Sequence, residues 1–210
     1  MSDVNQNLGS VRKKKGVKVV LLILVVLMAI ILLTEILDLT KNGGIQAAVA
    51  IFAGVSAVLM IIALILPIIL FCIWIFAFHS DLKIIDASYE IRPGQAIARI
   101  LIPGYNLWGI WNIHSTYGKW LQSKPAQQTK DSGAIIWKLL PLYYVCLIIG
   151  QVFDRIASRS GISDEIKAWL GIVGSVITLG YLITWLTLVD TMQGTLSAEK
   201  AKEKEQTQTI

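Results

Sequence analysis

The residues that could carry chemistry in this sequence stand at the edges of its long apolar segments. An ionisable side chain in or beside such a segment is the first place to look for a functional site, because its burial in an apolar medium is costly. Five polar residues fall at comparable depth in the sequence pattern: His79, Asp81, Asn106, His114 and Asp190. If their side chains meet, they would bind an ion, a headgroup or a partner. We treat them as the candidate polar cluster.

Each member of the candidate polar cluster also has a purely structural interpretation. A charged residue at a helix end extends into water or pairs with a neighbour, which is the role we favour for each residue taken singly. Lys138 stands at the same level, at the start of the third apolar segment. The cluster interpretation therefore requires at least three of the five side chains to lie close to a common point.

No motif for metal binding or catalysis occurs in the sequence. A metal site built from His79, Asp81 and His114 would lack the short spacings, such as H-E-x-x-H, that place two ligands on one helix face. The sequence also lacks the G-x-S-x-G nucleophile motif, the Walker loop and the dinucleotide-binding G-x-G-x-x-G pattern. We accordingly assign no catalytic residue, no metal ligand and no cofactor.

The composition is that of an integral membrane protein. Of the 210 residues, 55% are hydrophobic and 16% are charged, whereas soluble domains carry about 25% charged residues. The net charge of +5 comes from basic residues beside apolar segments, where they contact lipid headgroups. Cys72 and Cys146 lie inside different apolar segments and are predicted to be unpaired thiols. The expected partner is thus the lipid bilayer, and nucleic acid is excluded.

The apolar segments predict four transmembrane helices, at about residues 19–37, 45–78, 135–153 and 169–189. The first is longer than the apolar core of a secretory signal, so we interpret it as an uncleaved signal anchor. The second exceeds the length of one straight crossing, and Pro67 within it predicts a kink. The predicted organisation is a disordered basic segment (1–18), a four-helix membrane domain (19–190) and a charged tail (191–210).

Residues 94–122 are predicted to form an interfacial segment. Helical spacing gathers the apolar side chains of residues 107–121 into one arc, with Ser115 and Lys119 on the opposite side. This pattern indicates an amphipathic helix in the interface or a shallow re-entrant segment. The predicted fold class is therefore all-α and integral to the membrane, with four spanning helices and one such segment. Gly171 and Ser175 in the fourth span predict a closely packed face.

One segment carries a family resemblance. It reads Ile102-Pro103-Gly104-Tyr105-Asn106-Leu107-Trp108 and resembles a hinge in uncharacterised bacterial multi-span proteins of the domain-of-unknown-function 4328 family. The similarity covers about residues 45–190, with His79, Pro103, Asn106 and Trp108 at matching positions. This chain lacks the second proline that members often place shortly after the asparagine. The resemblance implies a multi-span topology and a bacterial origin, and it implies no activity.

The distribution of basic residues predicts the orientation. Residues 1–18, residues 79–132 and the tail contain five, six and three Lys or Arg, whereas the two short loops contain one and three. Basic segments remain on the cytoplasmic side of a membrane. We therefore expect a multi-pass protein of the bacterial cytoplasmic membrane with both termini in the cytoplasm.

Three functions are compatible with this pattern. We favour a non-enzymatic multi-pass membrane protein that acts through helix packing and cytoplasmic contacts, with a membrane-protein partner or a second copy of the chain. The second is a small transporter or channel subunit, which would support ion flux in liposomes. The third is an enzyme that acts on lipid at the inner interface, whose turnover would be lost in His114→Ala.

The predicted topology is tested by labelling single cysteines with a reagent that does not cross membranes. Positions 41 and 158–163 should react from outside the cell, whereas positions 124–130 and 200–205 should react only after the membrane is opened. Labelling of position 127 from outside would contradict the predicted orientation.

Overall fold

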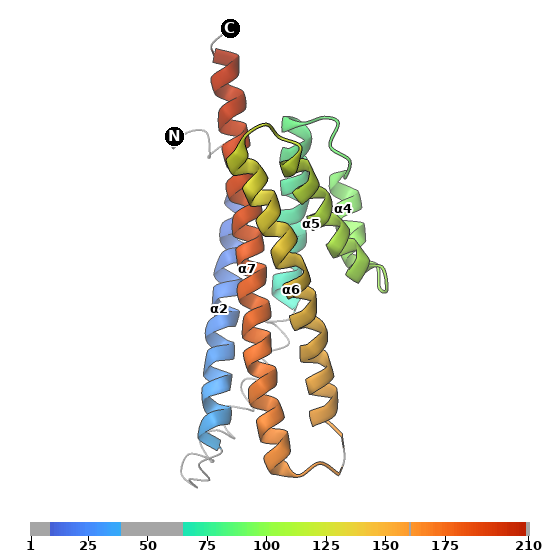
Figure 1. Ribbon diagram of the computed structural model, residues 1–210, viewed down its shortest axis with the longest axis vertical. Helices are drawn as coiled ribbons and strands as arrows, with labels where there is room; N and C mark the ends of the chain where they lie inside the picture. The colour runs from blue at the N-terminus through green and yellow to red at the C-terminus, as the bar shows by residue number, and fades with distance from the viewer. Residues whose placement is uncertain (1–8, 39–64, 160, 209–210) are drawn as a thin grey trace. The chain divides into compact units, whose positions relative to one another are not determined.

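The computed structural model describes residues 9–38, 65–159 and 161–208. All regular structure in these ranges is helical, in the order α2 (Gly9–Asp38), the helix Ile65–Ile85, α4 (Pro93–Leu101), α5 (Asn106–Gln122), α6 (Gln127–Ala157) and α7 (Asp164–Gln208) (Figure 1). Four of these helices, α2, Ile65–Ile85, α6 and α7, are long and apolar enough to cross a membrane. The predicted all-α fold with four candidate spanning helices is confirmed for the described residues.

The helices extend beyond the apolar segments that predicted them. α2 begins at Gly9, so the prediction of disorder over residues 1–18 is wrong for residues 9–18, which are helical. The second predicted span lies outside the described residues from 45 to 64, and its described helix continues to Ile85. α7 has 45 residues, which corresponds to about 68 Å at 1.5 Å per residue. The fourth span and the charged tail are therefore one continuous helix through Gln208.

The chain forms two compact units. Unit 1 comprises Met1–Val19, Ile68–Pro141 and Thr187–Ile210, and unit 2 comprises Val20–Pro67 and Leu142–Leu186. Unit 1 thus brings the described start of α2 together with the end of α7, around α4 and α5. All five residues of the candidate polar cluster belong to unit 1.

In unit 2, a carboxylate lies within the apolar length of α2. Ser175 Oγ donates a hydrogen bond of 2.7 Å to Glu35 Oε2. A Cβ added to Gly171 would lie 3.2 Å from Glu35 Oε1, so the glycine leaves room for the carboxylate. The closely packed face predicted from Gly171 and Ser175 is therefore confirmed, and it packs against α2.

The helices of unit 2 also expose large apolar side chains, which include Leu22, Ile23, Val26, Leu33, Leu142, Val145, Ile148, Val152, Val176 and Ile183. Water would make such a continuous apolar surface unfavourable. Contact with lipid tails removes that cost, as expected of a membrane-embedded protein.

In unit 1, glycines allow α5 to pack closely against its two neighbours along the chain. Gly109 of α5 lies so close to the Arg99 carbonyl of α4 that an added Cβ would overlap it. On α6, a Cβ at Gly133 would lie 2.8 Å from the Gly118 carbonyl oxygen of α5. Both contacts require the absence of a side chain, because real Cβ atoms do not approach backbone atoms so closely.

The hinge that carries the family resemblance is the turn between α4 and α5. α4 ends at Leu101, Gly104 has a φ of 79°, and α5 begins at Asn106. That left-handed backbone conformation favours glycine. The Asn106 side chain accepts a hydrogen bond from the Leu107 N–H at 2.8 Å. The predicted break in the helix is confirmed.

The predicted apolar arc of α5 is only partly buried. Ile113, Tyr117 and Leu121 are buried, but Leu107 is 49% exposed, and Ser115, predicted on the polar side, is buried. Ser115 satisfies its hydroxyl by donating to the Asn112 carbonyl, so its burial leaves no unpaired donor. The hydrophobic pattern thus predicted the helix correctly, but it placed Leu107 and Ser115 on the wrong sides.

Candidate functional site

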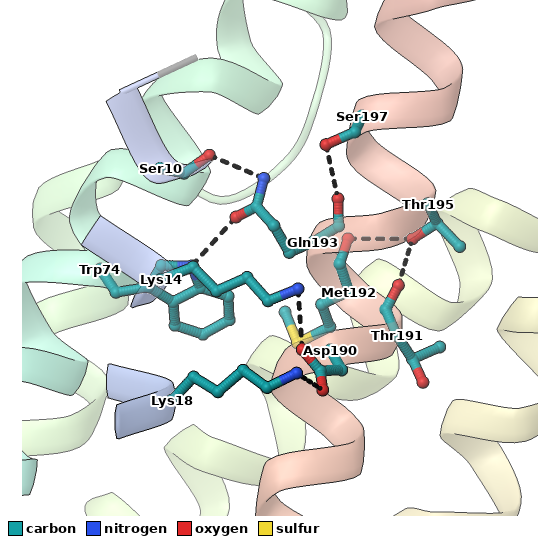
Figure 2. A network of polar contacts seen from close by, with 10 residues as sticks. All are labelled: Ser10, Lys14, Lys18, Trp74, Asp190, Thr191, Met192, Gln193, Thr195 and Ser197. Atoms are coloured by element: carbon teal, nitrogen blue, oxygen red, sulfur yellow. Dashed lines mark hydrogen bonds and ion pairs between the residues drawn. The ribbon is translucent and has the colours of Figure 1, made fainter. Parts of the chain in front are cut away.

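A buried hydrogen-bond network joins three helices of unit 1 (Figure 2). Ser10 donates its backbone N–H to Asp81 Oδ2 at 2.8 Å. Its hydroxyl accepts from Gln193 Nε2 at 3.1 Å. Trp74 Nε1 donates to Gln193 Oε1 at 3.0 Å. All four residues are at most 5% exposed. We call these four residues the buried network; it links α2, the helix Ile65–Ile85 and α7.

Asp81 acts in the buried network as a cap supplied by another helix. The first backbone N–H groups of a helix have no partner within it, and the helix dipole places partial positive charge there. The Asp81 carboxylate, held one helix away, accepts from one of these groups at the start of α2. The interaction therefore satisfies two groups that would each be costly to bury alone.

Asp190 forms ion pairs with two lysines of α2. Lys14 Nζ lies 2.7 Å from Asp190 Oδ1, and Lys18 Nζ lies 2.9 Å from Oδ2 (Figure 2). Lys14 and Lys18 are four residues apart and so share one face of the helix. Asp190 is one turn before Gln193 on α7, which places the ion pairs beside the buried network. Together they attach the first turns of α2 to α7.

The candidate polar cluster does not form one hydrogen-bonded group. Among the described residues, no hydrogen bond or ion pair joins any two of its five members. Asp81 and Asp190 bind the start of α2. The Asn106 side chain accepts from the adjacent Leu107 N–H in the α4–α5 turn. His79 and His114 are both buried elsewhere in unit 1.

The two histidines lie in an aromatic core. The His79 ring is 5.6 Å from those of Phe78 and Tyr89 between centroids. His114 Nδ1 lies 2.8 Å from the Ile110 carbonyl oxygen, so it must carry the hydrogen and donate. Burial lowers the pKa of His114 because an imidazolium is poorly solvated there. His114 is therefore neutral at pH 7, with an unprotonated Nε2.

A second polar group follows the helix Ile65–Ile85. Asp86 accepts from Trp120 Nε1 at 2.8 Å and from Ser88, and Lys124 Nζ lies 3.5 Å from its carboxylate. Lys124 also lies over the Trp120 ring, 4.2 Å from its centroid. The hydrogen bonds from Ser88 and Trp120, with the charge of Lys124, lower the pKa of Asp86 to about 2. This group fixes the start of the long connection to the end of α5.

A groove of about 310 Å³ lies between α6 and α7 in unit 1. It is lined by Gln128, Thr129, Ser132, Ile135, Asp190, Thr191, Gly194, Thr195, Ala198 and Lys202. At one end, Lys202 Nζ donates to Glu199 and Thr129. We call this feature the α6–α7 groove. The described residues contain no group of three or more His, Cys, Asp or Glu side chains that could hold a metal ion.

Sequence patterns did not identify several residues of the buried network and of the ion pairs with Asp190. Ser10, Trp74 and Gln193 lie 71 to 183 positions from their partners, a separation that no local pattern reveals. Lys14 and Lys18 had a usable signal. Their spacing places them on one helix face, provided that the helix is extended back from the apolar segment to Gly9.

Comparison with family models, with curated proteins and with solved structures found no match to this chain. The resemblance of residues 102–108 to the domain-of-unknown-function 4328 hinge therefore stays a prediction. The site is interpreted from its own geometry alone.

The depressed pKa of Asp86 predicts a loss of stability in acid. Its ordinary pKa is 3.8 and its folded pKa is about 2, so the stabilisation is complete above pH 4 and is lost as the pH falls from 4 to 2. Thermal unfolding in detergent should show this loss, which solvent screening of the accessible carboxylate limits to about 1 kcal/mol. Asp86→Asn should unfold more easily at neutral pH and lose less stability than the native chain over that range. Equal pH dependence of the two proteins would contradict the assignment.

Proposed function

We propose that this chain is a non-enzymatic multi-pass membrane protein that binds a protein partner through the α6–α7 groove of unit 1. The observation that carries the proposal is the groove itself, which opens to the surface and is lined in large part by small and hydroxyl-bearing side chains. Asp81 and Asp190 belong to the candidate polar cluster, but their carboxylates are occupied in contacts with the start of α2.

The dimensions of the groove favour a polypeptide segment over a small ligand. Its two charged residues on α7, Asp190 and Lys202, are twelve residues apart, or about 18 Å along the helix. Asp190 is already neutralised by Lys14 and Lys18, and Lys202 is paired with Glu199, so the groove offers length rather than unpaired charge. A helical or extended segment spans that length, and docking into a groove is a common mode of peptide recognition.

Small residues open the groove to such a segment. Gly194 and Ala198 are exposed on α7, one helical turn apart, and a Cβ added to Gly194 meets nothing within 4 Å. The hydroxyl groups of Thr129 and Thr195 are already hydrogen-bonded within the chain. Their side chains therefore form a pre-shaped wall, which limits the entropy lost on binding.

The proposal is tested by filling the groove. Gly194→Leu should fold normally, because the added side chain enters open space on a helix that tolerates leucine well. We expect recovery of a stoichiometric partner in mild detergent to fall at least about tenfold. Gly94→Leu is the matched control, since Gly94 also has open space around it but lies on α4. It should leave recovery unchanged.

Two outcomes would contradict the proposal. One is purification of the chain from its native membrane as a monomer without a stoichiometric protein partner. The other is equal partner recovery with Gly194→Leu and the native chain, although both fold. Ion flux from liposomes that hold the pure chain would instead support the transporter alternative.

A further inference from the structure

Five buried polar side-chain atoms of unit 1 have no hydrogen-bond partner within the described residues. One of them, Asp190 Oδ1, forms an ion pair with Lys14 Nζ; the other four are His79 Nδ1, His79 Nε2, Tyr89 Oη and His114 Nε2. The three side chains are at most 3% exposed. Each orphaned group costs about 1–3 kcal/mol of stability, and native proteins leave few such groups. Their concentration in three residues points to a bound group that would satisfy them.

The orphaned atoms belong to one region, which also contains an arginine. The rings of His79 and Tyr89 lie 5.6 Å apart between centroids. Arg99 and His114 both lie within electrostatic range of His79, and Arg99 lies within that range of Tyr89. The Arg99 guanidinium donates to Asn112 of α5, two residues before His114. These four residues come from the helix Ile65–Ile85, the connection after it, α4 and α5. We call them the histidine–arginine cluster.

The hydrogen-bonding capacity of this cluster is mainly that of donors. Arg99 offers five N–H groups, and its one hydrogen bond within the described residues goes to Asn112 Oδ1. Tyr89 Oη offers an O–H, and burial raises the pKa of this phenol, which keeps it protonated. A neutral His79 offers one N–H. His114 Nε2 is an acceptor, because Nδ1 donates to the Ile110 carbonyl.

Charge decides which kind of ligand fits. Arg99 is half-buried and has no carboxylate within ion-pair distance among the described residues. A metal cation would add a second positive charge beside it, whereas an anion would neutralise it. An oxyanion that also carries one hydroxyl would accept from Arg99, Tyr89 and His79 and donate to His114 Nε2.

We propose that His79, Tyr89, Arg99 and His114 form a binding site for a phosphate or phosphate monoester that retains one proton. Free inorganic phosphate and the phosphomonoester headgroup of phosphatidate share this chemistry. The site is separate from the α6–α7 groove and does not depend on the function proposed for that groove.

The test is ligand-dependent thermal unfolding of the full chain. Inorganic phosphate is added to the protein in detergent, with chloride at matched ionic strength as the blank, and phosphatidate is added in phosphatidylcholine vesicles. A ligand that binds only the folded chain raises the midpoint. We expect the unfolding midpoint to rise with inorganic phosphate, with phosphatidate or with both, and the source that raises it identifies the form of phosphate that the site binds. Sulfate, which has no proton to donate to His114, should bind at least about tenfold more weakly.

Two substitutions separate binding from folding. Tyr89→Phe removes an orphaned hydroxyl, so without ligand the chain should be as stable as the native one or more stable, while its affinity falls about tenfold. Arg99→Gln should weaken binding at least about a hundredfold. Arg92→Gln is the matched control, because Arg92 is exposed beside the same short helix, and it should bind as the native chain does.

Three results would overturn the proposal. The first is no rise in midpoint with either phosphate source. The second is equal binding of sulfate and phosphate. The third is stabilisation by Zn²⁺ that is lost in His79→Gln and retained in Arg99→Gln, which would assign the cluster to a metal ion.

Discussion

The attachment of the first turns of α2 to Asp81 and Asp190 is the interaction on which the arrangement of three helices of unit 1 depends, namely α2, the helix Ile65–Ile85 and α7. Lys14 and Lys18 neutralise Asp190, and Ser10 donates its N–H to Asp81. Asp81 is buried, and a buried charge left without its partner costs several kcal/mol, so the start of α2 must stay with the helix Ile65–Ile85. The partly exposed ion pairs of Asp190 add a smaller contribution that holds α7 to α2. The α6–α7 groove includes Asp190 and Thr191, so its shape is set by the same attachment.

Polar groups specify this arrangement where apolar packing alone does not. Apolar helices in lipid gain little from contact with one another, since lipid tails are as apolar as leucine. The hydrogen bonds of Gln193 to Ser10 and Trp74 have fixed partners and directions. The glycine contacts of α5 with α4 and α6 add a second kind of specificity, because a side chain at Gly109 or Gly133 would prevent them.

Local patterns in the sequence predicted the helices and the turn between α4 and α5, but they did not predict which side chains meet in the candidate site. Long apolar segments predicted the four candidate spans, Pro103 and Gly104 predicted the turn before α5, and Gly171 with Ser175 predicted a close contact. The helical residues before the first apolar segment were missed because hydropathy does not register a basic helix. The partners of Asp81 and Asp190 were missed because they depend on tertiary packing between distant segments.

The five candidate residues illustrate the same limit. The sequence pattern placed them at the ends of spans or in the loop between spans, but His114 lies in the middle of α5 and Asp190 within α7. Depth in the sequence pattern also does not say which helix faces which. Asp81 and Asp190 became structural anchors, whereas His79 and His114 were left with unsatisfied ring nitrogens beside Tyr89 and Arg99. Neither Tyr89 nor Arg99 belongs to a recognisable motif, so only the structure associates them with the histidines.

The central claim is that the first turns of α2 are held by Asp81 and Asp190, and amide hydrogen exchange tests it most directly. In the native chain in detergent, the amides of residues 10–18 should exchange at least about a hundredfold more slowly than in an unstructured chain, equivalent to about 2.7 kcal/mol of protection. The combined Asp81→Asn and Asp190→Asn substitutions should remove most of this protection and leave that of α5 unchanged. Equal protection of residues 10–18 with and without the two carboxylates would contradict the account.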